Sequence, residues 1–294
     1  MTRTRSWVVG AVAMLGVMGL AAACAPQAPD GGVASPNWAF KGTSVKVNSS
    51  QDAVYDPIFG ACISFAGCKD EPYLLNIGFR VKIGVPNSAQ TFVVNPRTDA
   101  PEDVAPGQTV NVVGTAAESK TTFAGVKPMD VLDLANSNNK LEIVGTYVWS
   151  SEEDQVGNGV GADAVAGLLK DGLNATLAQQ DLTNLDASFI IDLVLDNIGG
   201  ALGIVAQNIP LLGLGDDILG GGMYVGIAAR GTLGSAIDAL LGSTTFPNIE
   251  IPVVNLPPAI NGGGLYTMTG AKGFSQTFVG AGGSHTWTME AGPA

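Results

Sequence analysis

Short stretches of alternating apolar and polar residues mark the first half of the chain. In residues 79–83, for example, three apolar residues alternate with Arg80 and Lys82. A period of two predicts a strand with one buried and one solvated face. Strands at this spacing within residues 38–150 are typical of a β sandwich or an open barrel. Residues 44–48 also alternate, and further runs of strand-forming residues occupy residues 91–94, 109–113 and 141–149. Clusters of Pro, Gly, Asn and Ser separate these runs.

The pattern becomes helical after residue 150. Residues 162–178 and 187–207 place apolar residues three and four positions apart, and a shorter run of this kind follows further along the chain. Strand-like runs return between residues 245 and 294. We therefore predict an α+β fold in which a helical part, residues 151–244, packs on an antiparallel β sandwich or open barrel. The first and last strand-rich parts, 38–150 and 245–294, are expected to share one sheet and one domain.

Residues 187–207 form the most apolar of the predicted helices. Wound as a helix, the segment places Asp192 and Asp196 on one narrow stripe, and its other sides are apolar. The pattern predicts a core helix. The alternatives are the wall of a lipid-binding cavity and a segment that inserts into or spans a membrane. The two acids favour the core, because each carboxylate at a bilayer centre costs about 2.5–3.5 kcal/mol.

The N-terminus has the order of a secretory signal peptide. Arg3 and Arg5 precede an apolar run over residues 7–20, and small residues follow up to Ala23. The apolar run is shorter than the roughly 20 residues that a membrane span needs. We therefore predict that residues 1–23 are removed on export. Residues 24–37 are rich in Pro, Gly and small residues, which predicts a flexible tether.

Cys24 follows the small residues directly, and this arrangement resembles the lipobox of bacterial lipoproteins. The resemblance implies that a diacylglyceryl group, with acyl chains such as palmitate, is attached to the Cys24 thiol and that cleavage makes this residue the N-terminus. The chain is then anchored to the outer face of the cell membrane through that lipid. Ala21 stands where the family usually has Leu. The alternative is ordinary cleavage after Ala23, with full secretion.

The two other cysteines, Cys62 and Cys68, are an even number in an exported chain and lie in a Gly-containing stretch. This predicts a disulfide bond that closes a small loop. Free buried thiols and metal ligation are the alternatives. Metal ligation is disfavoured, because His285 is the only histidine and is far away in the sequence.

Residues 70–80 (DEPYLLNIGFR), followed by residues 84–89, resemble a segment of secreted actinobacterial proteins of unknown function. The resemblance implies a cell-envelope location and no particular activity. In physical terms, Asp70 and Glu71 form a turn into a strand that begins at the following proline. We expect Asp70, Glu71, Tyr73 and Arg80 to meet around one strand end. That cluster is interpreted as a structural corner, with a ligand-binding site as the alternative.

Charge and motifs exclude several classes of function. The formal net charge is −12, which repels nucleic acid, so no nucleic-acid partner is expected. A single histidine excludes sites that need two, and no Gly-x-Ser-x-Gly elbow is present. His285 is expected in a turn that leads into the last strand and is not expected to be catalytic.

Calcium is the one cofactor for which the sequence offers oxygen ligands on a loop. Their spacing does not match an EF-hand, and no other cofactor is expected. The candidate ligands are Glu152, Glu153, Asp154, Asn158 and Asp163.

The sequence therefore predicts an exported, lipid-anchored protein of the cell envelope that acts as a binding or scaffold module and not as an enzyme. One alternative is a carrier that holds an acyl chain in an apolar pocket lined by residues 187–241. Another is a hydrolase of envelope glycans that uses a pair of carboxylates.

Overall fold

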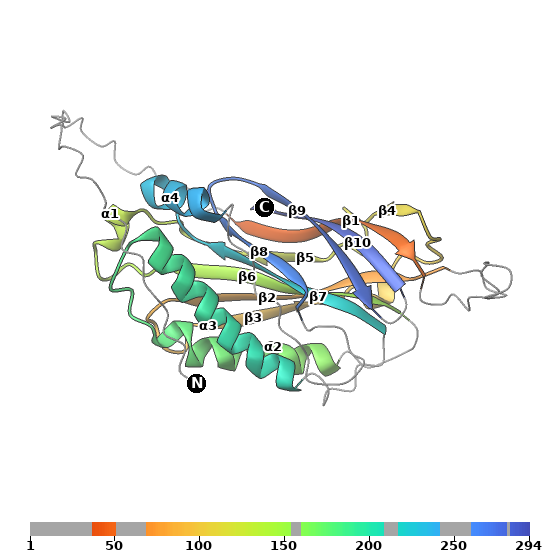
Figure 1. Ribbon diagram of the computed structural model, residues 1–294, viewed down its shortest axis with the longest axis horizontal. Coiled ribbons are helices and arrows are strands. Elements are labelled where there is room, and N and C mark those ends of the chain that lie inside the picture. The colour runs from red at the N-terminus through yellow and green to blue at the C-terminus, as the bar shows by residue number, and fades with distance from the viewer. Residues whose placement is uncertain (1–36, 51–68, 154–159, 209–216, 242–259, 281–282) are drawn as a thin grey trace, which may run out of the picture. The chain divides into compact units, whose positions relative to one another are not determined.

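A computed structural model describes residues 37–50, 69–153, 160–208, 217–241, 260–280 and 283–294. Residues 34–294 belong to one compact unit. Figure 1 shows the elements in their chain order. The strands are β1 (Trp38–Ser49), β2 (Pro72–Lys82), β3 (Gln90–Val94), β4 (Thr109–Asn111), β5 (Lys120–Phe123), β6 (Glu142–Glu152), β7 (Asp217–Ile227), β8 (Gly262–Thr267), β9 (Lys272–Gly280) and β10 (Gly283–Pro293). The helices are η1 (Arg97–Asp99), α1 (Val131–Leu134), α2 (Val160–Ala175), η2 (Leu177–Gln179), α3 (Ala187–Asn208) and α4 (Gly231–Leu241).

The strands form two five-stranded sheets. The first has the order β4-β1-β10-β9, with β5 also paired to β1, and the second has the order β3-β2-β6-β7-β8. All pairings are antiparallel except that of β7 with β8. β1 and β10 pair along their length, from Trp38 opposite Pro293 to Ser49 opposite Ser284. The predicted α+β fold is thus confirmed: the sheets form a sandwich, and the strands from the two ends of the chain share one sheet.

The two sheets face each other across a buried layer of large side chains. Phe40 and Trp287 come from the first sheet, and Leu74, Val148 and Tyr224 come from the second. Gly78 in β2 allows this close approach, because a Cβ atom there would collide with the side chain of Thr121 in β5. This inter-sheet layer forms one hydrophobic core of the molecule.

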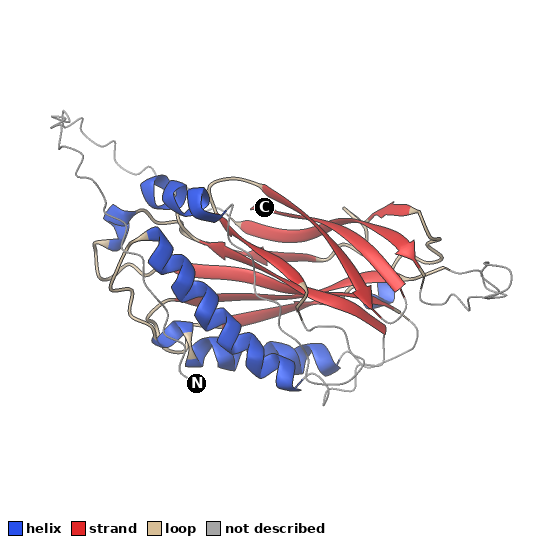
Figure 2. Ribbon diagram, in the orientation of Figure 1, coloured by secondary structure: helices blue, strands red, loops and turns tan. Residues whose placement is uncertain are grey.

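The helices cover the other face of the second sheet and form a second core with it (Figure 2). β2 and β6 are therefore buried on both faces over most of their length. The second sheet is the middle layer of three, between the first sheet and the helices. Strands that are buried on both faces do not alternate between buried and exposed residues. Residues 72–79 are accordingly all buried.

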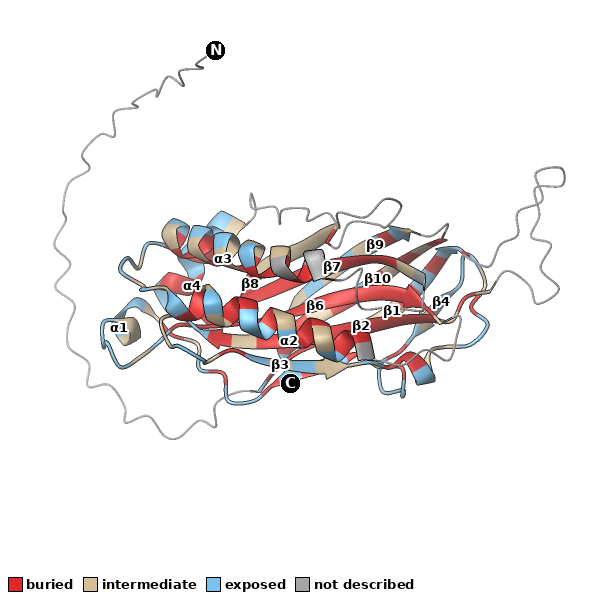
Figure 3. Cartoon of the chain, turned by 90° about the horizontal axis from the view of Figure 1, so that it is seen from below, coloured by how far each residue is buried: buried red, intermediate tan, exposed pale blue. Residues whose placement is uncertain are grey.

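α3 packs as a core helix. Ile190, Val194 and Ile198 recur at a spacing of four and are fully buried, whereas Asp192 and Asp196 are exposed. Each fully buried aliphatic side chain stabilises the fold by about 1.5–3 kcal/mol relative to an exposed one. Figure 3 shows the buried residues of α2 and α3 turned toward the sheet. Among the helices of the described ranges, none combines the length and the hydropathy that a membrane span requires.

Candidate functional site

The four residues expected to meet around one strand end do not all lie at the same end of β2. Asp70, Glu71 and Tyr73 lie at its beginning, and Arg80 lies near its other end. Asp70 lies before the strand and forms an isolated bridge with Val104. Arg80 lies near the other end of β2, where its Nε donates to Glu142 Oε1 (2.6 Å). Ten residues of strand span roughly 33 Å. The expected single cluster is therefore wrong, because residues close in sequence lie far apart along an extended strand.

Strand alternation separates the remaining members of that set. Tyr73 is buried in the core between the second sheet and the helices. Asp70 is buried beside the first sheet, on the opposite side of the second sheet. Glu71 is half-buried, and its carbonyl accepts a hydrogen bond from the backbone N–H of Glu153. Asp70 alone among the four contributes to a polar cluster between the sheets.

This inter-sheet polar cluster consists of Asp70, Ser150, His285 and Trp287. Asp70 Oδ2 lies 2.7 Å from His285 Nε2. Ser150 Oγ lies 3.4 Å from His285 Nδ1 and accepts a hydrogen bond from Trp287 Nε1 at 3.0 Å. All four residues are 0% exposed. Ser150 belongs to β6 of the second sheet, Asp70 lies two residues before β2, and the other two belong to β10, so the cluster joins the two sheets.

Register places these side chains in the inter-sheet layer. In β10, His285, Trp287 and Met289 are buried and alternate with Thr286 and Thr288, which are more exposed. His285 therefore lies within the strand, opposite Val47 and Phe278, and not in the turn expected from the sequence. The inward-facing position of a lone histidine in an alternating strand was the signal that sequence reasoning did not use.

The chemistry available to the inter-sheet polar cluster depends on its burial. A serine, a histidine and an aspartate are the residue types of a nucleophilic triad. Here the serine and histidine atoms stand 3.4 Å apart, and no member of the cluster is exposed to a substrate. What the cluster does in this arrangement is satisfy polar groups between two sheets. Removing only one partner of a buried pair of this kind strongly destabilises the fold, because the other partner is left buried without a counterpart.

The structure describes three of the five candidate calcium ligands, and these three are in different surroundings. Glu152 is the buried last residue of β6, Asp163 is exposed on α2, and Glu153 lies 3.7 Å from Arg97. Asp154 and Asn158 lie outside the described residues. Within the part of the chain that the structure describes, no three His, Cys, Asp or Glu side chains are grouped as a metal site.

The three cysteines also lie outside the described residues. The lipidation of Cys24 and the bond between Cys62 and Cys68 therefore stay predictions from the sequence.

A surface groove of about 540 Å³ lies where α1, α4 and the beginning of α3 meet. We name it the α1–α4 groove. Its lining is mostly apolar and includes the exposed residues Val131 and Leu240. Leu132 follows Val131 in α1 and is 86% exposed, although it is not itself a lining residue. A second pocket of about 340 Å³ adjoins it and shares Leu185. The residues that line the groove are Val131, Leu185, Asp186, Ala187, Ser188, Thr232, Leu233, Ala236, Ala239 and Leu240.

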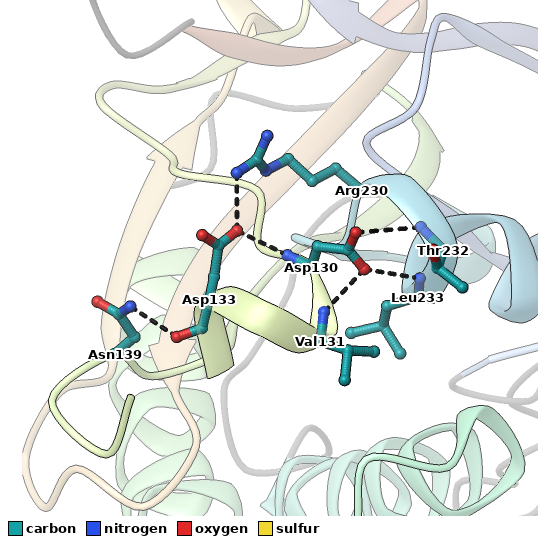
Figure 4. A network of polar contacts seen from close by, with 7 residues as sticks. All are labelled: Asp130, Val131, Asp133, Asn139, Arg230, Thr232 and Leu233. Carbon is teal, nitrogen blue, oxygen red and sulfur yellow. Dashed lines mark hydrogen bonds and ion pairs between the residues drawn. The ribbon is translucent and has the colours of Figure 1, made fainter. Parts of the chain in front are cut away.

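A polar network fixes the corner that carries the groove (Figure 4). Asp130 is the N-cap of α1 and accepts from the backbone N–H of Val131 (2.7 Å). The same carboxylate accepts from the N–H groups of Thr232 (3.3 Å) and Leu233 (3.0 Å), so it also caps α4. Asp133 completes the capping box and pairs with Arg230 (2.8 Å). One carboxylate thus holds α1 and α4 together.

Hydrogen bonds from the backbone N–H groups of Leu233 and Val131 hold the pKa of Asp130 below its usual range. Asp130→Ala removes caps from two helices at once and is expected to lower the Tm by about 2–4 °C. Because folding lowers this pKa, the carboxylate stabilises the fold above its ordinary pKa of 3.8 and loses that contribution as the pH falls through its folded pKa. The measurement is thermal unfolding at pH 7 and at pH 3.

Asp171→Ala is the matched control, because Asp171 is an exposed acid on α2. It should change the Tm little at either pH. The difference in Tm between wild type and Asp130→Ala should be smaller at pH 3 than at pH 7. A difference that stays constant with pH would show that the carboxylate charge plays no part.

No protein family, curated protein or solved structure matches this chain.

Proposed function

We propose that this chain is an exported, lipid-anchored protein of the cell envelope that acts as a binding or scaffold module and not as an enzyme. The observation that carries the proposal is the burial of the inter-sheet polar cluster, which contains the chain's one histidine. The order of charged, apolar and small residues before Cys24 supports the location.

The cluster suits cohesion between the sheets better than catalysis. A catalytic base needs a position within reach of a substrate proton, about 2.6–3.2 Å from it or one water molecule away. Asp70, Ser150 and His285 have no exposed surface in the folded chain. Neither the α1–α4 groove nor the adjoining pocket is lined by any of them. The serine, histidine and aspartate of this cluster are thus used to hold the fold, and the α1–α4 groove, one concave surface among the described residues, is mostly apolar.

Hydrolysis assays test the distinction between module and enzyme. The mature chain, residues 24–294, is offered aryl esters and envelope glycans, and any rate above background is compared with that of His285→Gln. Glutamine retains a side-chain amide that can donate to Asp70, and circular dichroism checks that the variant folds. We expect no rate above background from the wild type. A rate that His285→Gln keeps within a few-fold would show that the cluster is not catalytic but would contradict the absence of enzymatic activity. A loss of about a thousandfold, the scale of a triad member, would overturn the proposal.

The α1–α4 groove favours a second candidate, a carrier of an acyl chain. Its volume is within the range of about 300–1,000 Å³ that is usual for small-molecule sites. Ala187, Ala236 and Leu240 line it and fall within the segment for which the sequence predicts such a pocket. Saturable binding of a fluorescent fatty acid, lost in Ala236→Glu, would support the carrier. Exposed Ser235, in the same helix, gives the control Ser235→Glu.

A further inference from the structure

We propose that the α1–α4 groove and the exposed apolar residues at its edge form a membrane-contacting face. This face lies on the boundary between headgroups and acyl chains of the bilayer to which the chain is anchored. The inference rests on the proposed anchoring through Cys24 and adds to it an orientation of the folded body.

Exposed apolar residues concentrate at this corner. Three of the large apolar side chains that are exposed among the described residues lie at this corner: Val131, Leu132 and Leu240. The others, Phe92, Val113 and Val279, lie on different elements. A cluster of such side chains beside a groove marks an interaction surface, whereas single exposed ones are ordinary.

The exposed positions of α4 differ in charge from those of the other long helices. The exposed residues of α4 between Thr232 and Leu240 carry no charge, whereas α2 and α3 expose several acids. Of the acids that adjoin the groove, Asp130 caps two helices and Asp186 caps α3 by accepting from the N–H of Ser188 (2.9 Å). These carboxylates stay charged at the margin of the groove. On α4 itself the half-buried Asp238 pairs with Lys272 (3.7 Å), and the exposed positions of the helix, Thr232, Ser235, Ala236, Ala239 and Leu240, are uncharged.

The chain enters the folded body at the same end. Trp38, the first residue of β1, pairs with Pro293 of β10. Two residues earlier in β10, Ala291 pairs with Lys272, whose Nζ lies 3.7 Å from Asp238 in α4. Figure 1 shows the start of β1 and the C-terminus at the α4 end of the sheets. A membrane anchor joined to residue 37 is thus attached at the end of the sandwich that carries the groove.

The tether limits how far the folded body can move from the bilayer. Residues 24–37 reach at most about 45–50 Å when fully extended. A short linker keeps a weak surface at an effective concentration in the millimolar range, so contact occurs in the anchored chain even where the free chain does not bind. A chain without its lipid is therefore expected to remain soluble and not to sediment with neutral vesicles.

The test places a fluorescent reporter at the proposed face. The mature chain carries a hexahistidine tag before Cys24 and is held on phosphatidylcholine vesicles that contain a nickel-chelating lipid. Leu132→Trp is the reporter, and the vesicles contain either ordinary or brominated phosphatidylcholine. A side chain about 5–10 Å within the boundary meets the brominated acyl chains. The mature chain already has three buried tryptophans, Trp38, Trp149 and Trp287, so the wild-type emission is subtracted, and we expect the remaining emission of residue 132 to fall by about half.

Val279→Trp is the matched control. Val279 is equally an exposed apolar residue, but it pairs with Ser284 near the far end of β9 from Lys272. Its emission should not change between the two kinds of vesicle. Adding Leu240→Glu to the Leu132→Trp reporter should abolish the quenching at residue 132, with circular dichroism confirming that the fold is kept.

Quenching at both positions, or at neither, would overturn the proposal. So would a dimer in solution that shields residue 132, because a second copy would then be the occupant. The tag supplies the attachment, so the result does not depend on whether cells lipidate Cys24. Lipidation is read separately, from the mass of the N-terminal peptide of the chain isolated from cells.

Discussion

Cys24→Ala is expected to move nearly all of the mature chain from the membrane fraction to the soluble fraction. The acyl chains proposed on Cys24 contribute about 0.8 kcal/mol for each methylene group that enters the bilayer, so two such chains hold a protein firmly. Without the thiol no lipid can be attached. The measurement is fractionation of cells that express the full chain, combined with labelling by a palmitate analogue, which should be absent from the variant.

The comparison is restricted to molecules that have lost their signal peptide, because an uncleaved apolar segment can itself hold the chain at the membrane. Cys62→Ala and Cys68→Ala are the matched controls, since each removes a thiol without touching the proposed anchor. Both should stay in the membrane fraction and take up the label. Retention of processed Cys24→Ala in the membrane would contradict the lipobox interpretation.

His285→Ala is expected to lower the free energy of unfolding by about 3–5 kcal/mol, because it leaves the buried carboxyl group of Asp70 without its partner. Ser150→Ala should cost less, about 1–3 kcal/mol, since it leaves the Trp287 N–H without an acceptor. Both values are measured by urea denaturation at pH 7. Removing both ionisable partners, as in Asp70→Asn with His285→Gln, should cost less than the sum of the single changes.

Thr288→Ala is the control for the strand itself, because Thr288 is an exposed residue of β10 close to the cluster. It should stay within about 0.5 kcal/mol of wild type. A loss below about 1 kcal/mol for His285→Ala would show that the inter-sheet polar cluster does not hold the sheets together.

Alternation along the chain located most strands, but it could not show how many layers the fold has. For residues 79–83 it predicted that Arg80 and Lys82 share a solvated face. Lys82 is exposed, but the side chain of Arg80 lies mostly buried against Glu142. Its partner is far away in the sequence, and the covering sheet is formed by strands from both ends of the chain. Neither can be deduced from a two-residue period.

The candidate sites were less predictable than the fold, because each joins distant segments. The sequence grouped Asp70 with Arg80 because they are close along the chain. The structure instead joins Asp70 to His285, 215 residues away. The α1–α4 groove combines residues from three helices, one of them a single turn after β5. Such arrangements depend on strand register and helix docking, which local patterns do not encode.

The pairing of β1 with β10 sets the order in which the fold can be completed. β1 precedes the other strands of the body in the chain, but its longest-paired neighbour, β10, begins only at Gly283. Until β10 arrives, one edge of β1 lacks this partner, and contacts of such large sequence separation form slowly. In a chain exported as proposed, the first sheet therefore cannot close before residues 283–293 have crossed the membrane.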